Sequence, residues 1–229
     1  IFIMASLESI WQRSKPFKSI VFSIIVPMIL SLIFTYVVWH VTAAFSILSY
    51  IGIFSGALIL FSYLYRILSN FFYKKFINIG SAVAHIGFGL LFLAISLNSI
   101  LSYEKNLNLA PGETILIDES IEEFSFDDIK VLKASNHDVI SVEVSLLQDG
   151  KNIFLNPQKR KYATRGQITT ESSIHASILK DTYLTIGDQL DNGSWTFALK
   201  INYFIKWIWF SASLMVMGML ITIFKKKAI

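Results

Sequence analysis

The most regular feature of the chain is a set of four long apolar runs. A helix that crosses about 30 Å of hydrocarbon needs roughly 20 apolar residues, which is the length of each run. None of the runs alternates like a membrane-spanning strand, and a helix satisfies its own backbone hydrogen bonds. The pattern therefore predicts four transmembrane helices, at residues 19–39, 45–65, 78–97 and 204–224.

The segment between the third and fourth runs, residues 103–203, follows a different pattern. Turn dipeptides at 149–150 (DG) and 192–193 (NG) separate alternating segments, which is typical of β-hairpins. The strand-like segments are ETILI, IKVLK, ISVEVSLL, TYLTI and WTFALKI. About 100 residues of this kind predict an antiparallel sandwich or a partly open barrel. The predicted fold class is an α-helical membrane protein with four transmembrane helices and an inserted antiparallel β-rich extracytoplasmic domain.

Positive charge beside the apolar runs predicts how the chain crosses the membrane, because Lys and Arg are enriched in cytoplasmic loops. Three clusters flank the runs, whereas the loop at 40–44 carries no Lys or Arg. The clusters are Arg13, Lys15 and Lys18; Arg66, Lys74 and Lys75; and Lys225, Lys226 and Lys227. The expected order is a cytoplasmic segment at 1–18, three transmembrane helices within 19–102, a periplasmic β-rich domain at 103–203, a fourth transmembrane helix at 204–224 and a cytoplasmic tail at 225–229.

Composition supports the membrane class and excludes several others. The chain is 54% hydrophobic with a mean hydropathy of +0.57, which is too apolar for an ordinary soluble domain. Its net charge is +4, yet residues 103–203 hold ten Lys and Arg against fifteen Asp and Glu, so no nucleic-acid surface is predicted. The chain has no Cys, so any thiol chemistry would belong to a partner.

The first apolar run lacks a signal-peptide cleavage pattern, so no signal peptide is predicted. Met4 is a candidate start of the chain, and a fragment of a longer chain is the alternative.

His85 is the only histidine deep within an apolar run, on the order of 10 Å from the start of the third predicted helix. An imidazole at such a position is costly and therefore points to a function. Ser81, Gly87 and Gly89 suggest a small-residue face on which a flat macrocycle could approach the backbone. Neutral imidazole is a good axial ligand for haem iron. A histidine hydrogen-bonded to a neighbouring helix explains the same spacing, so the residues alone leave both interpretations open.

The remaining candidate residues carry weaker signals. His40 lies at the end of the first predicted helix, while His137 and His175 lie in the β-rich region, where solvated histidines are common. The segment NPQKRKY brings together Lys159, Arg160 and Lys161, a cluster that could hold carboxylates such as haem propionates or form only a solvated turn. Tyr203, Lys206, Trp207 and Trp209 begin the fourth run with the composition of an interfacial aromatic belt. Motifs for hydrolases, nucleotide binding and zinc proteases are absent from the sequence.

Several phrases of the sequence, taken in order, carry a resemblance to a known family. They are AHIGFGLLFLAISL at 84–97, YEKNLNLAPGE, NPQKRKY, TTESSI, DTYLTIGDQLDNGSW and KWIWFSASLMVMGML. Together they span about residues 78–224 and resemble the C-terminal part of the CcmF family of cytochrome c haem lyases. The order of the phrases and their relation to two helices argue against chance. The sequence departs from the family at Tyr203, where Pro is common, and at Lys206, where Arg is usual.

The resemblance implies a function in cytochrome c-type biogenesis. Members of the family are polytopic inner-membrane proteins that join the CxxCH thiols of apocytochrome c to haem vinyl groups, and they receive haem from a periplasmic carrier. A histidine in their AHxG motif ligates a transmembrane haem b that is thought to reduce the incoming haem. The match places this role on His85, as cofactor-binding residue and axial ligand to the haem iron, and it assigns no catalytic residue. The implied location is the bacterial inner membrane, with the mitochondrial inner membrane as the alternative.

The resemblance also implies partners, because the family's WWD segment and second transmembrane histidine belong to an N-terminal half that this sequence does not contain. His40 does not lie in a matching motif. The chain is expected to be a split subunit or a fragment that cannot attach haem to apocytochrome c alone. The expected partners are an N-terminal CcmF portion bearing the WWD segment, a periplasmic haem carrier, apocytochrome c with its thiol-presenting factor, and the lipid bilayer.

Two other functions stay open at this point. The first is a non-catalytic, membrane-anchored sensor or assembly factor whose β-rich domain binds a periplasmic ligand. It predicts that the chain holds no haem and that replacing His85 has no effect. The second is a permease subunit, which the sequence favours less because it offers one deep ionisable group and no pair of broken helices.

Overall fold

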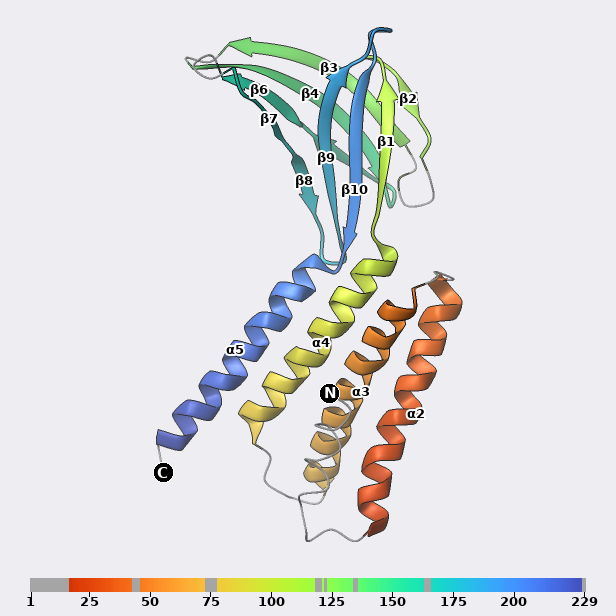
Figure 1. Ribbon diagram of the computed structural model, residues 1–229, viewed down its shortest axis with the longest axis vertical. Helices are drawn as coiled ribbons and strands as arrows, with labels where there is room; N and C mark the ends of the chain where they lie inside the picture. Colours follow the sequence, from red (N-terminus) through yellow and green to blue (C-terminus); the bar gives the residue numbers. More distant parts are fainter. Residues whose placement is uncertain are drawn as a thin grey trace. The chain divides into compact units, whose positions relative to one another are not determined.

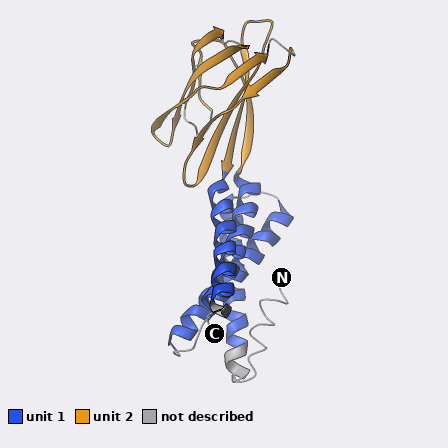
Figure 2. Cartoon of the chain, turned by 90° about the vertical axis from the view of Figure 1, so that its left-hand side faces the viewer, with its two compact units in different colours: residues 1–101, 203–229 blue, residues 102–202 orange. Residues whose placement is uncertain are grey.

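The computed structural model describes residues 17–42, 46–72, 78–117, 121, 123–133, 136–162 and 166–227. The chain divides into two compact units (Figure 2). One unit combines Ile1–Leu101 with Tyr203–Ile229 and the other is Ser102–Asn202; the described residues of the first lie mainly in helices and those of the second mainly in β-strands. The β-unit is therefore an insertion between two helices of the helical unit.

Four helices in the described part of the chain are long and apolar enough to cross a membrane. They are α2 (Phe17–Thr42), α3 (Ile47–Phe72), α4 (Ile79–Leu101) and α5 (Ile205–Lys227). Each packs against the next one along the chain (Figure 1). The four predicted spans are confirmed as helices, and each helix continues past the predicted end of its apolar run. The two longest, α2 and α3, have 26 residues each, or about 39 Å, which is longer than the hydrocarbon core.

The extension of α3 corrects the place of one predicted loop residue. Arg66 was expected to separate two helices, yet it lies within α3, two turns before the helix ends at Phe72. Its guanidinium carbon lies 5.9 Å from the centre of the Tyr63 ring, a cation–π contact within the same helix. The predicted charges at Arg13, Lys15, Lys74 and Lys75 lie outside the described residues.

Glycines let the helices approach at backbone distance. A Cβ atom on Gly56 of α3 would lie 2.8 Å from the carbonyl oxygen of Gly89 in α4. A Cβ atom on Gly218 of α5 would lie 2.4 Å from the backbone nitrogen of Ala84 and 2.6 Å from the carbonyl oxygen of Gly80, both in α4. No side chain fits at such contacts, so α3, α4 and α5 pack through small residues, as is common for helices within membranes.

The β-unit contains two antiparallel sheets, one of four strands and one of six (Figure 1). The first sheet has the order β1 (Tyr103–Leu109), β10 (Trp195–Tyr203), β9 (Lys180–Gln189) and β8 (Ser173–Ala176). The second has the order β2 (Thr114–Ile115), β3 (Glu123–Lys133), β4 (His137–Gln148), β6 (Gln158–Tyr162) and β7 (Ile168–Glu171), with β5 (Lys151–Leu155) paired to β4.

Aromatic side chains hold the two sheets together. Phe197 of β10 makes edge-to-face contacts with Phe124 and Phe126 of β3, at centroid distances of 5.6 and 5.1 Å. All three side chains are buried, and aliphatic residues from both sheets surround them. The predicted fold class of a helical membrane protein with an inserted antiparallel β-domain is confirmed, and of the two predicted β-architectures the sandwich is the one that forms.

The two predicted turns also lie between paired strands. Asp149 and Gly150 both have positive φ, 51° and 68°, as a two-residue turn between β4 and β5 requires. Gly193 has a φ of 86° in the loop between β9 and β10. The segment NPQKRKY is not a turn, because its last five residues form β6 and pair with both β4 and β7.

Candidate functional site

The strongest sequence candidate, His85, lies on α4 and faces α3. Its imidazole stacks on the ring of Tyr63 in α3, with centroids 4.6 Å apart and planes inclined by 19°. Tyr63 is 5% exposed and belongs to a small apolar cluster with Ile59 and Ala82. His85 itself is partly buried. The stacking fixes the plane of the imidazole against a residue that the surrounding helices hold in place.

The hydrogen bonding of His85 defines which ring nitrogen carries the proton. Its Nδ1 atom lies 2.8 Å from the backbone carbonyl oxygen of Ser81, one turn earlier in α4. A carbonyl oxygen only accepts, so Nδ1 carries the proton and donates it. The Ser81 hydroxyl is also near Nδ1, at 3.4 Å. In the neutral ring the lone pair is therefore on Nε2, and Nε2 makes no hydrogen bond to any of the described residues.

The contacts of His85 bear on one of the two interpretations left open by the sequence, a hydrogen bond to a neighbouring helix. Among the described residues, His85 forms its hydrogen bonds with Ser81 of its own helix, and its contact with the neighbouring helix is ring stacking. A metal-ligating histidine commonly donates its second nitrogen to a backbone carbonyl, which fixes the tautomer and raises ligand basicity. A metal bound by this imidazole would therefore lie on Nε2.

The expectation of an open small-residue face around His85 is wrong. Gly87 is two residues away, about 200° around the helix, and it faces α5. A Cβ atom on Gly87 would lie 2.8 Å from the carbonyl oxygen of Ser211 in α5. A Cβ atom on Gly89 would lie 3.0 Å from the carbonyl oxygen of Gly56 in α3. Both glycines serve close helix packing, and neither leaves space for a macrocycle.

The described residues fit a haem as the source of a single axial ligand. His85 offers one correctly protonated nitrogen donor. No group of three or more His, Cys, Asp or Glu side chains within the described ranges is arranged to hold a metal ion.

The other three predicted histidines have surroundings of their own. His40 is exposed in the last turn of α2, with its ring 6.2 Å from that of Tyr36. His137 begins β4 and lies opposite Tyr162 of β6, with ring centroids 5.2 Å apart. His175 is exposed on β8.

The basic segment of β6 is bound by acidic groups of its own domain. The amine of Lys159 forms an ion pair with Asp188 and donates to the carbonyl oxygen of Gly187, at 3.2 Å for the latter. Arg160 lies 3.6 Å from a carboxylate oxygen of Glu171. Because neighbouring residues of a strand point to opposite faces, Lys159 and Arg160 do not form one surface. The predicted carboxylate-binding cluster is thus divided between two internal ion pairs.

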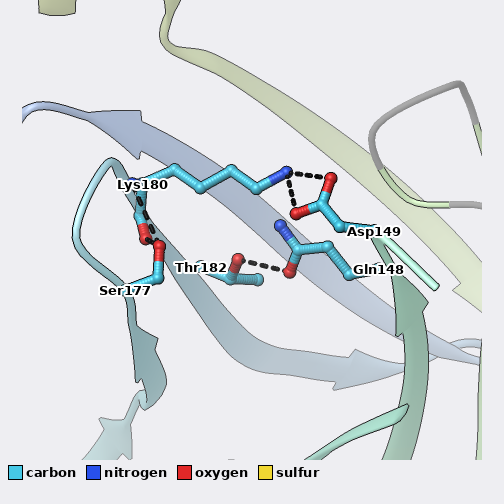
Figure 3. Close-up of polar contacts among 5 residues, drawn as sticks. All are labelled: Gln148, Asp149, Ser177, Lys180 and Thr182. Atoms are coloured by element: carbon cyan, nitrogen blue, oxygen red, sulfur yellow. Dashed lines mark hydrogen bonds and ion pairs between the residues drawn. The ribbon is translucent and has the colours of Figure 1, made fainter. Parts of the chain in front are cut away.

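Sequence reasoning missed a polar connection between the two sheets (Figure 3). The Lys180 amine of β9 lies 3.0 and 2.8 Å from the two carboxylate oxygens of Asp149, in the turn after β4. Beside it, the Thr182 hydroxyl donates to Gln148 Oε1 at 2.9 Å, in a buried position. A cavity of about 280 Å³ next to this pair is lined partly by Asp149, His175 and Lys180. The partners in the two contacts lie 31 and 34 positions apart in the sequence, so no local pattern could have revealed these contacts.

Tyr63 was also missed, because it is one of several aromatic residues in a uniformly apolar run. Its partner lies on a different helix, 22 positions away in the sequence. Only the packing of α3 against α4 distinguishes it from the neighbouring Phe61 and Tyr65.

The fold and the candidate site together define a class: a multi-pass membrane protein of four apolar helices with a β-sandwich inserted before the last helix. Comparison with known proteins gives this class a family. Residues 100–203 match the family described as "CcmF C-terminal beta-sandwich". This match, with the relatives and the solved structure below, supports a C-terminal part of the CcmF family of cytochrome c-type biogenesis proteins.

Individual relatives agree with this assignment. The chain is 32% identical over 140 residues to the cytochrome c-type biogenesis protein CcmF of Pseudomonas aeruginosa, a match that covers 61% of this chain and 21% of the relative. It is 30% identical over 146 residues to CcmF of Escherichia coli K12, covering 63% and 22%. The chain thus spans about a fifth of the length of these curated relatives.

A solved structure extends the similarity to the whole fold. The structure described as "Cytochrome c Heme Lyase CcmF" superposes with a TM-score of 0.71 at 12% sequence identity. The match covers 96% of this chain and 38% of the solved chain. At this identity the likeness shows that the chain shares its fold with part of that structure.

Proposed function

We propose that the chain is the C-terminal part, or a split subunit, of a CcmF-type haem lyase, in which His85 supplies one axial ligand to a transmembrane haem b. The observation that carries this proposal is the hydrogen bond from His85 Nδ1 to the Ser81 carbonyl oxygen. It leaves the Nε2 lone pair for a metal, as is typical of histidines that bind one. Family membership supplies the haem chemistry to which this geometry is applied.

The residues around His85 would orient the ligand. The Ser81 carbonyl oxygen fixes the tautomer, and Tyr63 fixes the plane of the ring. The close packing of α4 against α3 and α5 places His85 on a backbone that cannot shift without separating the helices. When bound, a haem b supplies an electron-transfer centre, which the family links to reduction of the incoming haem.

The activity of the whole assembly would be thioether formation on apocytochrome c. Each cysteine thiol adds across a haem vinyl group, so that sulfur bonds one vinyl carbon and the proton goes to the other. This chain contains no Cys, so the thiols come from the substrate protein. The proposed partners are an N-terminal CcmF portion with the WWD segment, a periplasmic haem carrier, and apocytochrome c with its thiol-presenting factor.

The proposed location is the bacterial inner membrane, with residues 103–203 in the periplasm. Support comes from the positive-inside rule, since Lys225, Lys226 and Lys227 follow the last apolar run while the loop at 40–44 carries no Lys or Arg. An even number of spans then places both ends of the described chain on the cytoplasmic side. Labelling of single introduced cysteines with a membrane-impermeant reagent tests this orientation.

The decisive experiment is an absorption spectrum of the membrane complex purified through this chain, in wild type and in His85→Ala. We expect a reduced-haem spectrum of bis-imidazole type that is lost or changed in His85→Ala. His40→Ala provides a matched control, because His40 also lies on an apolar helix but is exposed and outside the proposed site. An assembly without haem, or with full haem content in His85→Ala, would favour the sensor or assembly-factor function instead.

A further inference from the structure

We propose that the tip of the β8–β9 hairpin, Ile178 and Leu179, is a membrane anchor that inserts into the headgroup region of the bilayer. The proposal concerns the β-domain and depends on the helices crossing a membrane. It does not depend on haem binding at His85.

The tip is a tight and well-defined turn. Ser177 N donates to Lys180 O at 3.0 Å, so only Ile178 and Leu179 lie between the last paired residues of the hairpin. The Ser177 hydroxyl donates to the same carbonyl oxygen at 2.6 Å and accepts from Lys180 N at 3.2 Å. This turn therefore holds the two aliphatic residues at its end in a fixed position.

The composition of the tip is unusual for a turn in water. Ile178 is 72% exposed and Leu179 is 54% exposed. Hairpin tips normally contain Gly, Asn, Asp or Ser, because these residues adopt turn conformations and are solvated. The turn at Asp149 and Gly150 in this domain follows that rule, as does the DNG sequence in the loop between β9 and β10. Two large aliphatic residues at one tip indicate an apolar environment around it.

Sheet topology places this tip at a particular end of the sheet. β1 begins at Tyr103 opposite Ile201, close to where β10 ends. β9 and β10 form an antiparallel hairpin, with Thr185 bonded to Ala198 and Thr196 bonded to Asp188, so β9 begins near the end of β10. The β8–β9 tip therefore lies at the end of the sheet where the chain arrives from α4 and continues to α5.

The connections to the apolar helices leave from this end of the sheet and are short. Only Ser102 separates α4 from β1, and only Phe204 separates β10 from α5. One residue spans at most about 3.6 Å, so neither connection allows the strand ends to move far from the apolar helices. The first turns of α5 contain Lys206, Trp207 and Trp209, residue types that mark the membrane–water interface.

The lipid interface is therefore the occupant that these observations favour. The apolar tip side chains fit the boundary between headgroups and acyl chains, into which amphipathic protein segments insert by ~5–10 Å. A surface on another part of a longer protein is the competing occupant, and the experiment below distinguishes the two.

The natural absence of cysteine makes the test direct. Ile178→Cys and Leu179→Cys are each labelled with an environment-sensitive fluorophore, and the full chain is placed in vesicles of phosphatidylcholine and phosphatidylglycerol. Asp191→Cys is the matched control, because Asp191 is an exposed residue in the loop at the opposite end of β9. Circular dichroism confirms that each variant keeps its strand and helix content.

We expect lipids that carry a nitroxide near the headgroup to quench the two tip labels several-fold more than the Asp191 label. Iodide added to the aqueous phase should quench in the reverse order. Equal iodide quenching at both ends of β9 would overturn the proposal, because the tip would then lie in water. Protection of the tip labels from both lipid nitroxides and iodide would also overturn it, because protein rather than lipid would cover the tip.

Discussion

The imidazole of His85 stacks on the ring of Tyr63, with 4.6 Å between their centroids. The two residues lie on α4 and α3, so the contact couples the orientation of the proposed haem ligand to the packing of two helices. Tyr63 in turn lies beside the guanidinium of Arg66. A change at Tyr63 should therefore alter the proposed ligand without removing it.

Replacement of Tyr63 tests this coupling. Stacking contributes about 0.5–1.5 kcal/mol, so Tyr63→Leu should weaken haem retention by up to about tenfold. Tyr63→Phe keeps the ring and should retain more haem than Tyr63→Leu. Haem content per protein and the electron paramagnetic resonance of the oxidised haem provide the measurements. Equal haem content and equal spectra in all three proteins would show that Tyr63 does not position His85.

Gly218 should be intolerant of any side chain. A Cβ atom there would meet the backbone of Ala84, the residue before His85, at 2.4 Å. Gly218→Val must therefore separate α4 from α5, at a cost of at least about 1–3 kcal/mol. Thermal unfolding of the purified protein in detergent measures the loss. Met219→Val, at a neighbouring exposed position, is the control and should melt close to wild type; similar melting of both variants would contradict the packing argument.

The helices could be predicted from the sequence because membrane spans depend on a single property, the length of an apolar run. The ends of the helices could not be predicted, since α3 continues through Arg66 to Phe72, past the predicted end at residue 65. His85 was recognisable because an ionisable residue in an apolar run is conspicuous. The surroundings of His85 could not be predicted, because tertiary packing decides which helix, α3 or α5, lies against Gly87 and which lies against Gly89.

In the β-domain, too, some strands could be predicted from the sequence and others could not. Strands with strong alternation, such as those containing ISVEVSLL and WTFALKI, were predictable because one face is buried. β6 was not, because its sequence, QKRKY, is polar and its strand conformation comes from pairing with β4 and β7. Charged residues that form ion pairs across strands leave no periodic hydrophobic signal.

The buried pair of Thr182 and Gln148 should stabilise the sandwich as a unit. Thr182→Val leaves Gln148 without its donor in a buried site and should cost about 1–3 kcal/mol in the free energy of unfolding. Gln148→Leu should cost a similar amount, and the double variant should cost less than the sum of the two. Chemical denaturation followed by tryptophan fluorescence measures this cycle. Thr114→Val, at an exposed hydroxyl pair with Ser125, is the control and should change stability little; strict additivity would mean that the buried bond contributes nothing.

The ion pair between Asp188 and Lys159 should make part of the stability depend on pH. The hydrogen bond from Lys159, together with its charge, lowers the pKa of Asp188 below its ordinary value of 3.8. A carboxyl whose pKa is depressed on folding stabilises the folded state above its unfolded value, and this contribution disappears as the pH falls through the folded pKa. Asp188→Asn should therefore be less stable than wild type at neutral pH and equal to it in strong acid. Because Asp188 is exposed, the difference should be small and should shrink at high salt.

Unfolding curves of wild type and Asp188→Asn from neutral to strongly acidic pH measure the effect, with the exposed Asp191→Asn as control. A stability difference that stays constant from neutral to strongly acidic pH would show that the ion pair is not its source.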